Sequence, residues 1–326
     1  MEESKVKFVE EYPDFDLNKL PSYIREIIDD VYVEGKTKRT LVLPDGRKYF
    51  LGNKLNDLTG SEWTFFTNSV INTNYSTSKK EGDAHHIRKI HPSPKPPKLL
   101  KEIIKFFTKE NQIVFDYFAG VGGTLLASSM CNRRCLGIEL NETYINAYKE
   151  ANDYLGLNEQ TMLQGDSAKL LKSKVVSDYF SSEKASLILI DPPYGNMMSK
   201  EKTGDELRKH GKAATPFSEF EEDLGNMDSN EFWKNLVKII KSSLIYLKDG
   251  GHVVVFIKDL QPNGKEPNLL HATMIEKLNQ IESLYYRGMK IWADQSAMLF
   301  PYGYPFGFVA TQIHQYILIF KKKGSD

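Results

Sequence analysis

The hydrophobic pattern in the middle of the chain alternates between short aliphatic runs and helical periodicity. The aliphatic runs fall at residues 112–115, 136–138, 162–164 and 187–190. Runs of this length are typical of buried strands. One helix is predicted to begin at 125–130 after the first run, and another covers 143–154 after the second. This order predicts an α/β fold with a doubly wound, mostly parallel sheet.

The pattern before this region predicts a smaller unit. Apolar residues recur at helical spacing across residues 17–33, and short apolar runs at 40–43 and 48–51 flank a Pro-Asp-Gly turn. We therefore expect residues 1–54 to form a helix and hairpin extension, and residues 55–326 to form the main domain.

The segments that follow the extension differ in composition. Residues 55–67 contain three aromatic side chains and are expected to pack, whereas the polar residues 68–84 predict a mobile loop. His91-Pro92-Ser93-Pro94-Lys95-Pro96-Pro97 is a rigid, extended lead-in to a helix at 98–108.

The C-terminal part predicts a charged loop and then alternating elements. Residues 195–228 are too long for an ordinary connector, so we expect a functional loop or insertion there. Ser229 is predicted to cap a helix at 231–247 that ends at Gly250-Gly251. The elements predicted after it are a strand at 252–257, a helix at 269–280, and strands at 289–292 and 315–320.

Composition narrows the class of protein. With 40% hydrophobic residues among 326, the chain can bury a sizeable core, and no apolar run is long enough to span a membrane. The N-terminus lacks the apolar stretch of a signal peptide. The two cysteines, Cys131 and Cys135, indicate a reducing compartment and favour buried side chains over a metal site. We therefore expect a cytoplasmic protein without metal.

The formal net charge is zero, which is unusual for a protein that coats nucleic acid. Four basic clusters remain, each more typical of a solvated surface than of a binding site: Lys79-Lys80, Arg88-Lys89 through Lys105, Lys200 to Lys212, and Lys321 to Lys323. A local basic face could still contact phosphates.

Acidic residues and a glycine loop coincide at the predicted strand ends. Asp116 and the loop Phe118-Ala119-Gly120-Val121-Gly122 follow the first strand, while Glu139 ends the second and Asp166 follows the third. The glycines let backbone approach a ligand, and an acidic residue after the second strand suits ribose hydroxyls. This arrangement favours a nucleoside-binding pocket, as in a dehydrogenase or a methyltransferase.

Asp191-Pro192-Pro193-Tyr194 decides between these two classes. The prolines end the fourth strand abruptly, so a carboxylate, a free carbonyl and an aromatic ring stand at the ligand-binding edge of the sheet. The chain resembles amino-methyltransferases that modify adenine N6 or cytosine N4 in DNA. The resemblance is carried by this tetrapeptide, the glycine loop, the proline segment from His91 and the run from Ile291 to Lys321. The resemblance covers roughly residues 55–323.

The resemblance implies a Rossmann-like class I methyltransferase fold with an antiparallel last strand, and S-adenosylmethionine as cofactor. It implies that the methionine part and sulfonium are held by Asp116, Phe118, Ala119, Gly120 and Gly122. It assigns Glu139 to the ribose, Asp166 to the adenine edge and Lys95 to the methionine carboxylate. His91 is expected to orient the proline turn rather than to touch the cofactor.

The chemistry of the tetrapeptide fits this family. An exocyclic amine is a poor nucleophile because its lone pair is delocalised into the base. The Asp191 carboxylate and the Pro192 carbonyl can each accept an amino hydrogen, which aims the lone pair at the methyl group. Pro193 completes the turn, and Tyr194 would stack on a base flipped from the duplex. Asp rather than Ser at position 191 leans towards adenine.

An aromatic loop at 299–309 admits two interpretations. Its rings include Tyr302, Tyr304 and Phe306, and they alternate with Gly and Pro. They could pack as a rigid loop under the sheet, or they could form the far wall of the flipped-base pocket with Tyr194.

The resemblance implies double-stranded DNA as a partner. It also implies a role in a restriction-modification system, with a cognate restriction enzyme as a partner, or in an orphan modification system. The oligomeric state is open, and a homodimer is one alternative. The order of motifs is permuted relative to many relatives, and target recognition is assigned to residues 1–90, to 195–228 or to a partner. Two rivals remain. One is an RNA methyltransferase acting on guanine N2, because Asp-Pro-Pro-Tyr followed by Gly195 also occurs there, and the other is a non-catalytic nucleic-acid-binding relative.

Overall fold

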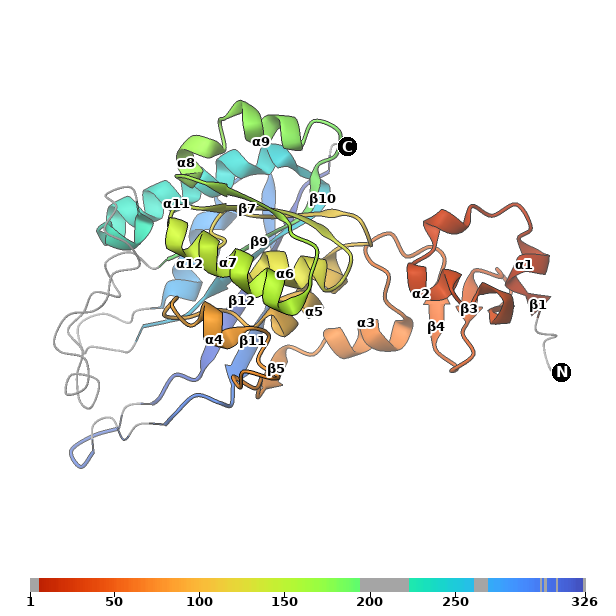
Figure 1. Cartoon of the computed structure of the whole chain (residues 1–326), viewed down its shortest axis with the longest axis horizontal. Helices are drawn as coiled ribbons and strands as arrows, with labels where there is room; N and C mark the ends of the chain where they lie inside the picture. The colour runs from red at the N-terminus through yellow and green to blue at the C-terminus, as the bar shows by residue number, and fades with distance from the viewer. Residues whose placement is uncertain are drawn as a thin grey trace.

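The computed structural model describes residues 6–193, 223–260, 269–299, 301, 304–308 and 310–324. The larger sheet consists of β5 (Val70–Thr73), β6 (Ile113–Asp116), β7 (Arg134–Glu139), β8 (Thr161–Gln164), β9 (Ala185–Ile190), β10 (Leu247–Ile257), β11 (Leu284–Asp294) and β12 (His314–Lys322). Their order is β5-β11-β12-β10-β9-β6-β7-β8 (Figure 1). Strands β8, β7, β6, β9 and β10 are parallel, and β12 is antiparallel to both neighbours. The predicted doubly wound sheet with an antiparallel last strand is therefore confirmed.

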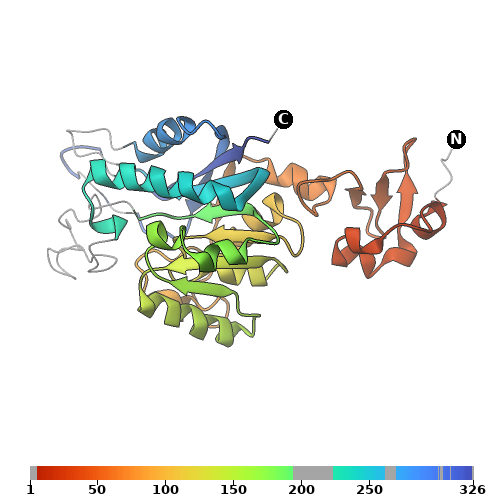
Figure 2. The ribbon, with the colours of Figure 1, turned by 90° about the horizontal axis from the view of Figure 1, so that it is seen from above.

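Helices cover both faces of this sheet (Figure 2). One face carries α5 (Pro97–Phe107), α6 (Gly123–Ser129) and α7 (Glu142–Leu155), and the other carries α9 (Lys174–Tyr179), α11 (Ser229–Ser243) and α12 (Leu270–Asn279). In β9, Leu187 and Leu189 face the first layer while Ile188 and Ile190 face the second. A strand between two helical layers is buried on both faces, which explains the aliphatic run at residues 187–190.

The N-terminal extension forms a second, four-stranded sheet in the order β1 (Val6–Lys7), β2 (Tyr32–Glu34), β3 (Thr40–Val42) and β4 (Lys48–Phe50). It has its own core, which includes Phe8, Ile24 and Tyr49. The predicted hairpin is confirmed as β3 and β4. The continuous helix predicted at 17–33 is wrong, because Pro21 forces Leu20 into an extended conformation and only short helical turns form on either side.

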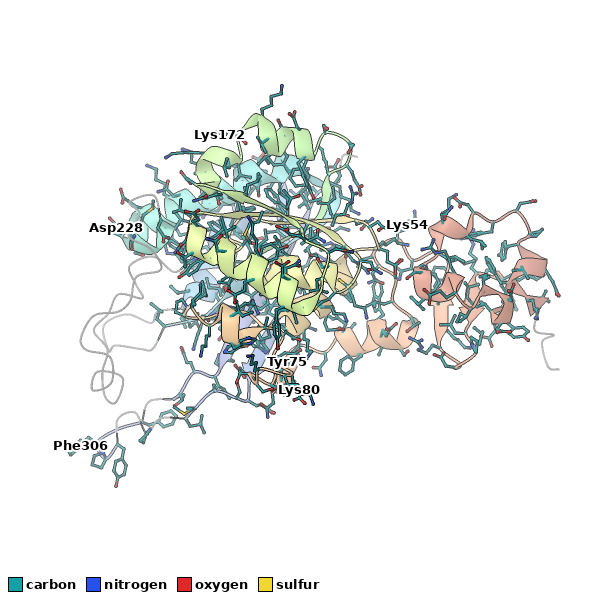
Figure 3. All side chains as sticks on the ribbon, in the orientation of Figure 1. Lys54, Tyr75, Lys80, Lys172, Asp228 and Phe306 are labelled. Carbon is teal, nitrogen blue, oxygen red and sulfur yellow. The ribbon has the colours of Figure 1, made fainter. Side chains whose placement is uncertain are left out.

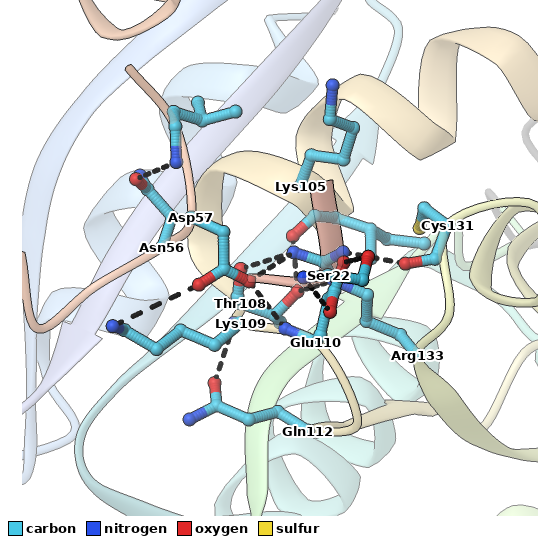
Figure 4. Close-up of polar contacts among 12 residues, drawn as sticks. Ser22, Asn56, Asp57, Lys105, Thr108, Lys109, Glu110, Gln112, Cys131 and Arg133 are labelled. Carbon is cyan, nitrogen blue, oxygen red and sulfur yellow. Dashed lines mark hydrogen bonds and ion pairs between the residues drawn. The ribbon is translucent and has the colours of Figure 1, made fainter. Parts of the chain in front are cut away.

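A polar network joins the extension to the main domain (Figure 4). The backbone N–H and hydroxyl of Ser22 donate to the Glu110 carboxylate at 2.9 and 2.6 Å, and the Glu110 N–H donates to Asp57 at 2.6 Å. Arg133, which is 6% exposed, donates to Asp57 at 3.3 Å and to the Thr108 carbonyl at 2.9 Å. Buried charges that are satisfied in this way hold a junction in one geometry. Lys54 lies in the connecting segment (Figure 3).

The loop predicted at 68–84 is wrong in part, because Val70–Thr73 form β5, parallel to β11. Contacts with residues more than 200 positions away in the sequence hold this short strand in the sheet. The Lys290 ammonium donates to the carbonyls of Phe66 and Asn68, at the end of α3 (Gly60–Phe66). The Trp292 indole N–H donates to the Thr73 hydroxyl at 2.8 Å.

Two further boundaries differ from the prediction. Asp228, not Ser229, caps α11, because its carboxylate accepts from the N–H groups of Asn230 and Glu231. The chain enters β10 at Leu247, so Gly250-Gly251 lie inside an irregular part of that strand. Helix α8 (Ser167–Leu170) and α9 between β8 and β9 were not predicted. In the described part of the chain, no helix is long and apolar enough to cross a membrane.

Candidate active site

A cavity of about 930 Å³ opens at the carboxyl ends of the central parallel strands. This is the edge where open α/β sheets bind ligands. Its walls include the proline segment (His91, Lys95), the glycine loop (Phe118, Gly120), the ends of β7 and β8 (Glu139, Asp166), the end of β9 (Asp191, Pro192, Pro193) and the end of β10 (Lys258, Asp259). Segments that are far apart in the sequence therefore meet around one space.

Asp191 and Lys95 form an ion pair in this cavity. The Lys95 ammonium donates to Oδ2 of Asp191 and lies 5.6 Å from the centre of the Phe256 ring, and Lys95 is only 8% exposed. The other carboxylate oxygen, Oδ1, is buried and has no hydrogen-bond partner among the described residues. Such an atom is costly to bury unless a ligand supplies a donor. Tyr194 lies outside the described residues.

Glu139 fastens the glycine loop to the end of β7. Its Oε2 accepts from the Gly120 N–H at 2.7 Å, and its Oε1 accepts from the Asn141 N–H at 2.8 Å. Burial raises the pKa of Glu139, while these backbone donors oppose the rise. Gly120 has a φ of +51°, which glycine adopts without strain.

Asp166 and Phe118 lie on the cavity wall, as the sequence predicted for a cofactor pocket. The Asp166 carboxylate caps α8 by accepting from the Ala168 N–H at 2.8 Å. Among the described residues, the cavity wall does not include Asp116, Ala119 or Gly122. These three residues are buried, and any contact with a ligand stays a prediction.

Gly122 allows α7 to pack closely. A Cβ atom at this position would lie 2.2 Å from the Tyr148 ring, and φ is +71°. We expect Gly122→Ala to lower the free energy of unfolding by more than about 3 kcal/mol, because the clash adds to backbone strain of about 1–2 kcal/mol. Gly156→Ala is the matched control, because φ there is +62° but nothing lies within 4 Å. Equal losses in urea unfolding would contradict this role for Gly122.

Asp116 is buried under the glycine loop and accepts from the Phe118 N–H at 3.0 Å. Burial raises the pKa of Asp116 from 3.8 to about 7, and the charge of Asp191 adds to the rise. The folded protein therefore keeps a proton that the unfolded chain releases near pH 4, and stability falls as the pH rises from about 4 to about 7.

We expect Asp116→Asn to remove this dependence, because the amide does not titrate. Between pH 5 and pH 8 the wild-type protein should lose about 3 kcal/mol more unfolding free energy than the variant, because about 1.4 kcal/mol is lost for each pH unit up to about pH 7. Urea unfolding of both proteins at the two pH values measures the difference. Parallel stability curves would show that Asp116 does not titrate in this range.

His91 orients the proline turn, as expected, and also lies on the cavity wall. Its Nδ1 accepts from the Ser93 N–H at 3.1 Å, and the centres of the His91 and Tyr144 rings lie 5.0 Å apart in an edge-to-face arrangement. Burial lowers the pKa of His91 to about 4, so the ring is neutral at physiological pH.

Arg88 is a buried residue beside the site that sequence reasoning missed. It was assigned to a solvated basic cluster, yet it is 1% exposed in α4 (His85–Arg88). Its Nε donates to the Val121 carbonyl at 3.2 Å and its Nη2 to the Lys95 carbonyl at 2.8 Å. Arg88 thus connects the glycine loop to the segment that carries Lys95. No local pattern distinguishes such an arginine from its exposed neighbours.

Lys258 and Gln315 also line the cavity and were not predicted. Lys258 follows β10 directly, so the strand-end rule that identified Glu139 could have identified it. Burial lowers the pKa of Lys258, and the charge of Lys95 adds to this. The Oε1 atom of Gln315 is buried without a partner among the described residues.

The predicted base-pocket residues lie in the connection between β11 and β12. Tyr302 lies outside the described residues, whereas Tyr304 and Phe306 are 80% and 96% exposed. Figure 3 shows Phe306 well away from the sheet. The packed-loop interpretation is therefore wrong for these two rings, and their role in a base pocket stays a prediction.

The sequence of this chain is similar to those of known methyltransferases. A sequence model of DNA methylases acting at N6 or N4 matches residues 24–150 and 185–326. A tRNA (guanine(10)-N2)-dimethyltransferase from Pyrococcus abyssi is 23% identical over 50% of this chain and 43% of that protein. The type II methyltransferase M.HindIII from Haemophilus influenzae is 39% identical over 24% of this chain and 25% of that protein. The chain thus spans less than half the length of these relatives. The structure of TrmN from Thermus thermophilus has a TM-score of 0.45 and 14% identity, over 73% of this chain and 52% of that one.

Proposed function

Since this chain belongs to the N6/N4 DNA methylase family of S-adenosylmethionine-dependent methyltransferases, we propose that it methylates the exocyclic N6 amine of adenine in double-stranded DNA. The observation that carries the proposal is how the two carboxylate oxygens of Asp191 are placed. One of its oxygens is held by Lys95, and the other is buried at the cavity without a partner among the described residues. Aspartate at this position favours adenine over cytosine N4 as the target.

The cavity fits the cofactor of this family. Its volume of about 930 Å³ lies within the range of roughly 300–1,000 Å³ that is usual for small-molecule sites. Gly120 and Phe118 would lie along the methionine part, Glu139 at the ribose and Asp166 at the adenine edge. When bound, S-adenosylmethionine supplies an electrophilic methyl group on its sulfonium.

The chain's own residues prepare the amine. Lys95 contacts Oδ2 of Asp191, so Oδ1 is left to accept a hydrogen from the amine. The Pro192 carbonyl has no competing demand from a strand, because the two prolines end β9. Two fixed acceptors would draw the amino group out of conjugation and aim its lone pair at the methyl group.

We propose Lys95 as a positioning residue for Asp191 rather than as a ligand of the methionine carboxylate. Its ammonium already contacts Oδ2 of Asp191 and is almost fully buried. A single-point contact on Oδ2 fixes the carboxylate and leaves Oδ1 for the substrate. Arg88 supports this arrangement from below, because it holds the Lys95 carbonyl.

A second candidate is methylation of guanine N2 in RNA. It is favoured by the similarity to tRNA (guanine(10)-N2)-dimethyltransferases of Pyrococcus abyssi and Methanocaldococcus jannaschii, at 23% and 27% identity. The same pair of acceptors could hold a guanine amine. The two candidates differ in the base and in the sugar, so the product separates them.

Methylome sequencing of a host that expresses the chain tests the first candidate. We expect new N6-methyladenine at one short sequence motif, and none in a host that expresses Asp191→Ala. New N4-methylcytosine instead would show that the target base is cytosine and that DNA is still the substrate. The absence of any DNA mark, together with cofactor-derived label in RNA, would overturn the proposal.

A further inference from the structure

Five large apolar side chains are exposed together in the connection between β11 and β12. Met298, Leu299, Tyr304, Phe306 and Phe308 are 69%, 74%, 80%, 96% and 91% exposed. We refer to these five residues as the aromatic arm. Water-exposed rings at this density are typical of an interaction surface.

The connection that carries the aromatic arm begins and ends at the cavity. Met298 and its neighbour Ala297 line the cavity on one side of the connection, and Thr311 and Gln312 line it on the other. The base of this connection is therefore part of the cavity wall. The labelled ring of Phe306 lies away from the sheet, on the outer part of the connection (Figure 3).

The chemistry of the arm suits nucleobases better than phosphates. Residues 295–313 contain no Asp, Glu, Lys, Arg or His, so this segment forms no ion pairs with a phosphate backbone. Pro305 and Gly307 separate the three rings, so no bulky neighbour in the sequence covers a ring face. Every base offers a π face, but in a duplex both faces are already stacked on neighbouring base pairs.

We propose that the aromatic arm stacks on unpaired nucleobases that flank the target base. The inference rests on the proposed function in so far as it takes nucleic acid as the substrate. The arm would hold the strand beside the cavity after local unpairing, while the cavity holds the target base. The protein should therefore prefer a single strand, or a duplex with unpaired positions near the target, over a perfect duplex.

Binding of a fluorescein-labelled, mixed-sequence single-stranded DNA tests the proposal, with the blunt duplex of the same sequence as comparison. We expect tighter binding of the single strand by the wild-type protein. Phe306→Ala/Phe308→Ala should weaken it by about 5- to 150-fold for each ring that stacks on a base. Affinity for S-adenosylmethionine should stay the same, because both rings are exposed and neither lines the cavity.

Two controls make the result specific to stacking. Phe65→Ala removes a ring that is 82% exposed on α3 and should leave binding unchanged. Phe306→Leu/Phe308→Leu keeps apolar surface but removes the rings, so it should bind as weakly as the alanine variant. The slope of affinity against salt concentration should be the same in wild type and variants, because no phosphate contact is lost.

Several outcomes would overturn the proposal. One is equal affinity of the wild type and the alanine variant for the single strand, and another is wild-type affinity in the leucine variant. A third is a wild-type dimer that becomes monomeric when the rings are removed, because the arm would then be a contact between two copies of the chain. The proposed function is tested separately. If the protein methylates DNA but loses no affinity when the rings are removed, only the proposal for the aromatic arm fails. If binding depends on the rings but no DNA is methylated, only the proposed function fails.

Discussion

Asp191→Asn should lower the rate of methyl transfer by about 10²–10³-fold while affinity for S-adenosylmethionine stays close to that of the wild type. The amide has the shape of the carboxylate, but it replaces one acceptor oxygen with a donor and removes the charge that Lys95 contacts. Single-turnover transfer and calorimetric titration of the cofactor measure the two quantities.

A second variant separates charge from position. Asp191→Glu keeps the carboxylate but moves it by one methylene, and it should lose a similar factor if Oδ1 must lie at a fixed point beside Pro192. If Asp191→Asn transfers methyl groups at the wild-type rate, Asp191 is not an acceptor for the amine. A large loss of cofactor affinity would instead place Asp191 in the cofactor site.

Lys95→Met should reduce kcat by about 10–100-fold and leave the dissociation constant of S-adenosylmethionine unchanged, because it removes the only ion pair of Asp191 among the described residues. Lys95→Arg should restore part of the rate.

Lys258→Met is the matched control, because Lys258 lines the same cavity and is also partly desolvated. It should lower kcat far less than Lys95→Met does, because the described residues show no ion pair between Lys258 and Asp191. The role that the sequence suggested for Lys95, binding of the methionine carboxylate, predicts the opposite split: cofactor affinity would fall and kcat would change little. The two measurements together decide between these roles.

The sequence predicted well those features that depend on a local pattern. The aliphatic run of β9 and the two prolines after it placed Asp191 at the ligand-binding edge. The glycine loop, Glu139 and Asp166 were found in the same way, because parallel strands bring their carboxyl ends to one edge.

Features that depend on distant partners were not predicted. Strand β5 is only four residues long and lies within a polar segment, and its partner β11 is more than 200 residues away in the sequence. The contact between Lys95 and Asp191 joins residues 96 positions apart, and Arg88 looks like a surface residue until its two acceptor carbonyls are known. Short-range patterns carry no information on such contacts.

The most direct test of the proposed reaction is a competition for one methyl donor. The purified protein is incubated with genomic DNA and total RNA in one tube, with S-adenosylmethionine that carries a deuterated methyl group, and the digested nucleosides are analysed by mass spectrometry. We expect the label in N6-methyl-2′-deoxyadenosine, and an initial rate of labelling lower by about 10²–10³-fold when Asp191→Asn replaces the wild type. Label in N2-methylguanosine, with none in deoxynucleosides, would contradict the proposal that DNA is the substrate.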